Sequence, residues 1–241
     1  MPRPNAICFD MGYTLLQHAP TGPDLYLRIL AQHGHTVTAA ELDAAVRPAR
    51  DFYIRATREG RPFESSMELA IEFWEEYNGI VLERLGLPID IHGSLGKKIY
   101  TAAWSPASWR LFPDVIPTLD ELRHQGIRMA VISNFVDTLD AVCVSHGLSQ
   151  YFDVILPSVQ AGTMKPDPEI FGIALRRLGV EAEEAWHVGD NYWADILGAR
   201  AAGLTAVLVD RERAVPHPDG PVVHSLDQLV GLLAEAEEEA A

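Results

Sequence analysis

The chain places one carboxylate at the end of a short apolar run. Asp10 follows Ile7-Cys8-Phe9 and precedes a turn that contains Gly12. An ionised carboxylate is costly at the end of a buried strand unless something pairs with it, and a metal ion or a phosphorus atom under attack would be such a partner. Ligands of α/β sheets bind outside the carboxyl ends of the strands, so Asp10 is the first candidate site residue.

Three later segments repeat this layout of apolar strand, polar cluster and helix. The clusters are Ser133-Asn134 after 128–132, Lys165 after 152–156, and Gly189-Asp190 after 185–188, with Asp195 following. Each cluster also has a simpler interpretation. Ser-Asn is a common turn pair, a lone lysine is usually solvated, Asp190 could be a helix N-cap, and Asp195 could be an exposed helix residue.

Along the chain the clusters supply a carboxylate, then a hydroxyl plus an amide, then an ammonium, then a pair of carboxylates. In this order the chain resembles the haloacid dehalogenase-like (HAD) hydrolase superfamily over nearly its full length. The resemblance implies that Asp10 is a nucleophile that forms an aspartyl-phosphate. It implies that Lys165 is catalytic and also binds substrate, because its ammonium offsets charge on the nucleophile and the phosphoryl group. Ser133 and Asn134 would bind the phosphoryl oxygens.

The same resemblance implies a Mg²⁺ cofactor. Its ligands would be the carboxylates of Asp10 and Asp190 and the backbone carbonyl of Gly12, since a hard cation takes oxygen ligands. Asp195 would be a supporting carboxylate, oriented toward the metal directly or through water.

One position departs from the family pattern. Phosphatases of this superfamily usually carry a second Asp two residues after the nucleophile, as general acid and base, but this chain has Gly12 followed by Tyr13. Loss of an acid–base catalyst should cost about 10²–10⁴ in rate, mainly for leaving groups that need a proton. Tyr13 and His18 are near enough in sequence to replace it, although we expect Tyr13 to pack under the inserted helices and His18 to lie in a linker.

The dehalogenases of the superfamily also lack that Asp. Their motif has an aromatic residue two positions after the nucleophile, and their last segment has Ser and Asn where this chain has Gly189-Asp190. The sequence therefore favours a Mg²⁺-dependent phosphohydrolase that acts on a small soluble phosphorylated metabolite, either a monoester or an acyl phosphate. A metal-independent 2-haloacid dehalogenase and a non-catalytic phosphate-binding protein are the alternatives.

Alternating segments predict the fold of the core. Helices are expected at 114–125, 137–147, 167–178 and 193–202, and strands at 128–132, 152–156, 185–188, 205–209 and 222–223. Such βα units form a parallel sheet with helices on both faces, so the class is α/β. We expect a Rossmann-like three-layer core built from residues 1–16 and 108–241.

Residues 17–107 are expected to form an inserted helical cap domain. Amphipathic periodicity replaces the strand signal there, and Thr38-Ala39-Ala40-Glu41 and Ser65-Ser66-Met67-Glu68 are typical of helix starts. Gly34, Gly60 and Gly86 fall where helices would end. By resemblance, the cap closes over the carboxyl ends of the strands.

Several other side chains are expected to be structural. His187 and the two cysteines, Cys8 and Cys143, lie in apolar contexts that predict core positions. The arginines of one inserted helix are expected to form a solvated face, and the aromatic residues of the next to pack in the cap; these are Arg47, Arg50, Arg55, Arg58, Phe73, Trp74 and Tyr77.

Composition limits the partners. The formal net charge of −15 repels nucleic-acid phosphates and anionic membrane surfaces, so we expect neither as a partner. With 48% hydrophobic and 22% charged residues the chain can bury a full core. No signal-peptide pattern or membrane-length apolar run is found, which predicts a cytoplasmic protein. The oligomeric state is open, a homodimer included.

Overall fold

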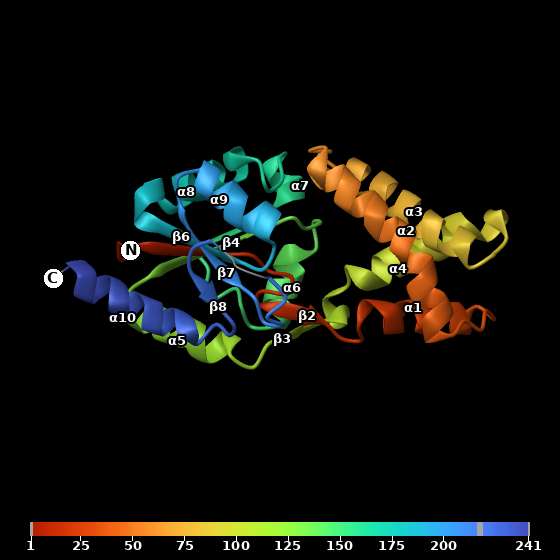
Figure 1. Cartoon of the computed structure of the whole chain (residues 1–241), viewed down its shortest axis with the longest axis horizontal. Helices are drawn as coiled ribbons and strands as arrows, with labels where there is room; N and C mark the ends of the chain where they lie inside the picture. The colour runs from red at the N-terminus through yellow and green to blue at the C-terminus, as the bar shows by residue number, and fades with distance from the viewer. Residues whose placement is uncertain (1, 216–218, 241) are drawn as a thin grey trace.

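A parallel sheet of six strands forms the centre of the core in the computed structural model, which describes residues 2–215 and 219–240 (Figure 1). The strands are β1 (Ala6–Phe9), β4 (Arg128–Ser133), β5 (Val154–Pro157), β6 (Ala185–Gly189), β7 (Thr205–Val209) and β8 (Val222–Val223). Their order is β5-β4-β1-β6-β7-β8, with parallel pairing throughout. β1 therefore lies between β4 and β6, where the chain switches direction across the sheet, and this is where such sheets bind ligands.

Strand β1 has apolar residues on both faces. Ile7 and Phe9 pack in one buried cluster while Ala6 and Cys8 pack in the other, because successive side chains of a strand point to opposite faces. The first face is covered by α5 (Val115–His124), α6 (Leu139–Ser145) and α10 (Gln228–Ala240), and the second by α8 (Pro168–Leu178) and α9 (Gly198–Ala201) (Figure 1). The predicted α/β class with a three-layer, Rossmann-like core is confirmed.

One core helix differs from its predicted form. The segment expected as a helix over 193–202 begins as a π-helical turn, η4 (Tyr192–Leu197), and continues as α9. Single π-turns often occur at functional sites. The turn contains Asp195, which is buried.

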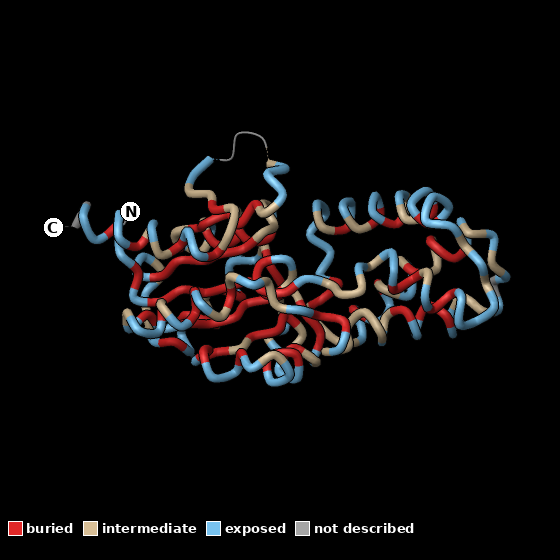
Figure 2. The backbone as a smooth tube through the Cα atoms, turned by 90° about the horizontal axis from the view of Figure 1, so that it is seen from below, coloured by how far each residue is buried: buried red, intermediate tan, exposed pale blue. Residues whose placement is uncertain are grey.

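Four longer helices fill the inserted segment and lie beside the sheet as a second lobe (Figures 1 and 2). They are α1 (Gly22–Gln32), α2 (Ala39–Arg58), α3 (Met67–Arg84) and α4 (His92–Ala103). Thr38 caps α2 in a full capping box with Glu41, as its sequence predicts, whereas Ser66 rather than Ser65 caps α3. Gly34, Gly60 and Gly86 follow helix ends with positive φ.

The two connections between the lobes form a small sheet that the sequence analysis missed. Strand β2 (Leu16–His18) pairs antiparallel with β3 (Trp109–Leu111), so the segments that leave and re-enter the core run side by side. Each strand is too short for a pattern of alternation to be visible in the sequence. His18, expected in a linker, is instead a strand residue whose ring packs against that of Trp109, at a centroid distance of 3.9 Å and an interplanar angle of 30°.

An aromatic cluster joins the lobes at a second place. Phe52, Phe63 and Phe73 from the inserted segment pack with Met164, which precedes Lys165 in the core. The rings of Phe63 and Phe73 stack with a centroid distance of 3.9 Å. This contact holds the loop between α2 and α3 next to the carboxyl edge of the sheet.

Other structural predictions are also confirmed. Cys8 and Cys143 are buried free thiols. Within the part of the chain that the structure describes, no helix combines the length and the apolar character that a bilayer crossing needs.

Candidate active site

Asp10 lies directly beyond β1 and is 7% exposed. Its Oδ1 accepts hydrogen bonds from Ser133 Oγ at 3.0 Å and from Lys165 Nζ at 2.7 Å. These partners come from the ends of two other segments of the core, as the shared sheet edge predicts. An ion pair in this buried position fixes the carboxylate while its second oxygen stays clear of both donors.

Lys165 is 2% exposed and is held between two carboxylates. Its Nζ donates to Asp10 Oδ1 and, at 2.6 Å, to Asp195 Oδ1. Burial alone would lower the pKa of Lys165, but the two carboxylates outweigh it and raise that pKa above its ordinary value. The lysine is therefore a permanent cation at the site, and the interpretation of it as a solvated surface group is wrong.

Asn134 holds the main chain of that lysine. Its Nδ2 donates to Lys165 O at 2.9 Å, and its Oδ1 accepts from Lys165 N at 2.8 Å. Because both ends of the amide are engaged, the side chain positions Lys165, and its second Nδ2 hydrogen and its backbone N–H are the donors left to meet a phosphoryl oxygen.

Asp195 is fully enclosed and holds the lysine from the other side. Besides Lys165 it accepts from His187 Nε2 at 3.0 Å and from Asn191 N at 2.9 Å. Burial favours the neutral acid, yet Lys165 and then His187 keep the pKa of Asp195 well below its usual range. Both oxygens are thus satisfied by protein donors, and Asp195 is not the exposed helix residue of the alternative interpretation.

Gly189 makes room for Asp195. A Cβ at position 189 would overlap the Asp195 carboxyl group, so only glycine allows the π-turn to bring this carboxylate under the end of β6. His187, predicted to be a core histidine, is fully buried on β6 and serves as a donor to Asp195.

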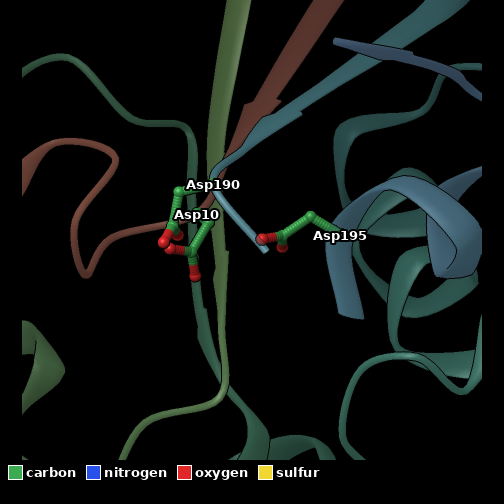
Figure 3. Close-up of side chains that lie close together, drawn as sticks. All are labelled: Asp10, Asp190 and Asp195. Carbon is green, nitrogen blue, oxygen red and sulfur yellow. The ribbon is translucent and has the colours of Figure 1, made fainter. Parts of the chain in front are cut away.

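Asp190 follows β6 and faces Asp10 (Figure 3). Carboxylate oxygens of Asp10, Asp190 and Asp195 lie within 4.8 Å of one another. Among the described residues Asp190 accepts only one side-chain hydrogen bond, from Thr14 Oγ1 at 3.4 Å. Burial, and then the charges of Asp10 and Asp195, raise the pKa of Asp190 well above its ordinary value. Asp190 has no strong donor of its own among the described residues, so its carboxylate beside that of Asp10 fits a divalent cation, which Asp10, Asp190 and Gly12 could hold.

A cavity of about 550 Å³ opens from these residues toward the inserted helices. Asp10, Gly12, Ser133, Asn134, Lys165, Asp190 and Asp195 all line it. Its other walls are mostly aromatic and come from both lobes, including Tyr26, Tyr53, Trp74, Tyr77, Tyr100, Trp104 and Trp109. A phosphorylated molecule bound here would have its phosphorus at the sheet edge and its organic part among aromatic rings.

Tyr13 and His18 also line this cavity. The expectation that Tyr13 packs under the inserted helices is wrong, because its side chain is 52% exposed and its φ is 58°. Arg50 is exposed, as expected of the arginines of α2, and it also lines the cavity.

Three residues near the site were not identified from the sequence. Thr14 bonds Asp190, Trp109 lies against Gly12, and Glu64 enters the cavity from the loop between α2 and α3. Thr14 lies inside the first motif and could have been proposed from it. Trp109 and Glu64 carry no local signal, because their places depend on how the two lobes pack.

Comparisons with known proteins agree with this arrangement. The family model described as haloacid dehalogenase-like hydrolase matches residues 4–203. Haloacid dehalogenase-like hydrolase domain-containing protein 3 of Xenopus laevis is 34% identical over 93% of this chain and 93% of its own length. With some other curated relatives the match spans about half of their length. The human protein of that name is 39% identical over 58% of this chain and 57% of its own length. A phosphoserine phosphatase of Thermus thermophilus is 40% identical over 52% of this chain and 49% of its own length.

Solved structures share the fold. A magnesium-bound HAD hydrolase of Bacillus subtilis superposes with a TM-score of 0.79 at 22% identity, over 96% of this chain and 99% of that one. A 2-haloacid dehalogenase of Pseudomonas syringae superposes with a TM-score of 0.63 at 28% identity, over 98% and 99%. The second match is therefore to a protein named as a dehalogenase.

The charge arrangement predicts opposite stability effects for two neighbouring carboxylates. Asp195→Asn breaks a buried ion pair and should lower the free energy of unfolding by about 3–5 kcal/mol. Asp190→Asn removes repulsion with Asp10 and should raise that free energy when no divalent metal is present. Urea unfolding in EDTA measures both variants, and a loss of stability in Asp190→Asn equal to that of Asp195→Asn would contradict the assignment of the two roles.

Proposed function

The chain belongs to the haloacid dehalogenase-like hydrolases, and on that premise we propose that it is a Mg²⁺-dependent phosphohydrolase. Its substrates would be small soluble phosphorylated metabolites, cleaved through an aspartyl-phosphate on Asp10. A cytoplasmic location, where such metabolites are found, is part of the proposal.

The observation that carries the proposal is the position of Asp190. A carboxylate that faces the nucleophile and has one weak protein donor is costly unless a cation lies between them, and oxygen ligands suit Mg²⁺. Asp10, Asp190 and the carbonyl of Gly12 would hold the ion. When bound, Mg²⁺ would neutralise charge on the nucleophile and on the phosphoryl oxygens.

The protein's own side chains supply the remaining requirements of phosphoryl transfer. The free oxygen of Asp10 would attack phosphorus, while Lys165 and Ser133, which hold its other oxygen, fix the direction of attack. The Lys165 ammonium would also offset charge that develops on the transferred group. Asp195 and Asn134 keep the lysine in place from opposite sides.

The names of relatives support phosphate chemistry. The partial matches include a phosphoserine phosphatase and, at 42% identity over 42% of this chain, a ribulose-1,5-bisphosphate 5-phosphatase. We propose further that residues 17–107 form a cap domain that closes the cavity above the core formed by residues 1–16 and 108–241. The aromatic wall then selects the organic part of the substrate.

A 2-haloacid dehalogenase is the second candidate, favoured by the aromatic cavity and by the superposition on the Pseudomonas syringae enzyme. A dehalogenase of this kind needs no cation, so Asp190 would have no evident role in its reaction. Halide release from a 2-haloacid in EDTA, without phosphate release from any ester in Mg²⁺, would establish this alternative.

The first test of the proposal concerns the metal. Asp190→Ala should abolish Mg²⁺-dependent release of phosphate from a panel of phosphorylated metabolites, as should Asp10→Asn. Mg²⁺ should raise the melting temperature of the wild type and leave that of Asp190→Ala unchanged, because ligand binding stabilises only a protein that binds it. Wild-type turnover in Asp190→Ala would refute the metal assignment.

The second test concerns Lys165. Arg preserves the charge but has a larger planar fork that cannot fit between Asp10 and Asp195, so Lys165→Arg should lose most of the activity. The exposed Lys97→Arg is the matched control and should keep wild-type kcat/KM. Equal kcat/KM for the two variants would remove Lys165 from the mechanism.

A further inference from the structure

Position 12 does not supply a proton donor. The wall of the cavity beside Gly12 is the ring of Trp109, which would lie 3.7 Å from a Cβ at that position and which packs against the ring of His18. No acidic side chain is therefore contributed by the second residue after Asp10. If the proposed hydrolysis acts on alkyl esters, the proton must come from another part of the cavity.

Glu64 is a carboxyl group in the opposite wall. It is 3% exposed and lines the same cavity as Asp10, Lys165 and Asp190. Its Oε1 accepts a hydrogen bond from Trp74 Nε1 at 3.3 Å, which is its only side-chain hydrogen bond among the described residues. Its backbone N–H contacts Met164 Sδ at 3.3 Å, one residue before the catalytic lysine. A buried carboxyl group is therefore anchored at both its main chain and one oxygen, while its second oxygen accepts no hydrogen bond from the residues that the structure describes.

We propose that Glu64 is the catalytic acid and base that position 12 lacks: it protonates the leaving oxygen and then deprotonates the attacking water. The proposal rests on the proposed phosphohydrolase function and assigns the proton transfer of that reaction to the inserted lobe. The cap would then complete the active site when it covers the substrate, because the nucleophile comes from one lobe and the proton from the other.

The two steps balance. As Asp10 forms its bond to phosphorus, the bond from phosphorus to the leaving oxygen breaks, and the Glu64 proton moves to that oxygen to give a neutral alcohol. Glu64, now a carboxylate, takes one proton from the incoming water as the water oxygen bonds to phosphorus. The Asp10–phosphorus bond breaks, phosphate leaves, and both carboxyl groups return to their starting states.

Burial supports this role. Removal from water raises the pKa of Glu64 to about 8, so the group carries its proton near neutral pH. The titratable groups whose charges interact with that of Glu64 are Lys165, Asp10, Tyr53 and Tyr100. An acid–base catalyst works best with a pKa near the working pH.

The other two candidates are less suited. His18 Nδ1 lies 3.2 Å from the Ser108 carbonyl oxygen, and burial lowers the pKa of its ring, so it is neutral when a proton is needed. Burial and the charge of Asp190 raise the pKa of the Tyr13 phenol, which makes it a weak acid. Tyr13 is also half exposed, so water competes for its hydroxyl.

Leaving-group dependence tests the assignment. Glu64→Gln keeps an oxygen for Trp74 and replaces the acidic hydroxyl by an amide group of similar size that cannot serve as acid or base. It should lower kcat/KM for an alkyl phosphate by about 10²–10⁴, and for 4-nitrophenyl phosphate, whose phenolate leaves without a proton, by no more than a few-fold. The exposed Glu68→Gln, four residues away on α3, is the matched control and should change neither value.

The pH profile gives a second readout. For the alkyl ester, wild-type kcat/KM should fall as pH rises through about 8, where Glu64 loses its proton, and this alkaline limb should be absent in Glu64→Gln. Equal losses on both esters would mean that Glu64 is structural and would overturn the proposal. So would a selective loss in His18→Gln or Tyr13→Phe with none in Glu64→Gln. A wild type inactive on both esters, with 2-haloacid turnover, would instead refute the phosphohydrolase function itself.

Discussion

The arrangement of the site depends on one buried lysine shared by two carboxylates. Lys165 Nζ lies 2.7 Å from Asp10 and 2.6 Å from Asp195, away from water. A buried ammonium is stable only if anions surround it, and a buried carboxylate only if donors do, so each of the three groups requires the others. Asp195 has both oxygens engaged, Oδ1 by Lys165 and His187 and Oδ2 by Asn191 N. The missing side chain of Gly189 leaves the space for this carboxyl group. The remaining carboxylate, Asp190, is left without a cation of its own, and this imbalance is the main argument for a metal.

The two lobes supply different parts of the candidate site. The core holds Asp10, Lys165 and the carboxylates of Asp190 and Asp195 at the carboxyl edge of the sheet, where strands β1, β4 and β6 end side by side. The inserted lobe supplies the aromatic wall and Glu64, and it is tied to the core by the β2–β3 pair and by the Phe63–Phe73–Met164 contact. Because Gly12 has no side chain and Trp109 forms the wall beside it, a proton donor from the inserted lobe fits the shape of the cavity.

Much of the core could be predicted from the sequence because its signals are local. Asp10, Ser133, Lys165 and Asp190 each follow an apolar strand, and parallel strands bring their carboxyl ends to one edge. The role of Asn134 as a clamp on Lys165, the satisfied state of Asp195 and the exposure of Tyr13 could not be predicted, since each depends on contacts between distant segments. Glu64 is the clearest case: it lies in a loop with no periodicity, and its burial involves Trp74 of the inserted lobe and Met164 of the core, which the sequence does not show to be neighbours. The short strands β2 and β3 likewise form only because they pair with each other.

The proposed mechanism requires that water attacks phosphorus and not the carboxyl carbon of an ester on Asp10. A single turnover of enzyme in excess over an alkyl phosphate, in water enriched in heavy oxygen, tests this requirement directly. Mass spectrometry of the products and of the peptide that contains Asp10 would locate the label. The account predicts heavy oxygen in the released phosphate and none in the Asp10 carboxylate. Label in the carboxylate of Asp10 would mean that water attacks the carbon of the ester intermediate, as dehalogenase-type chemistry requires, and would contradict the account.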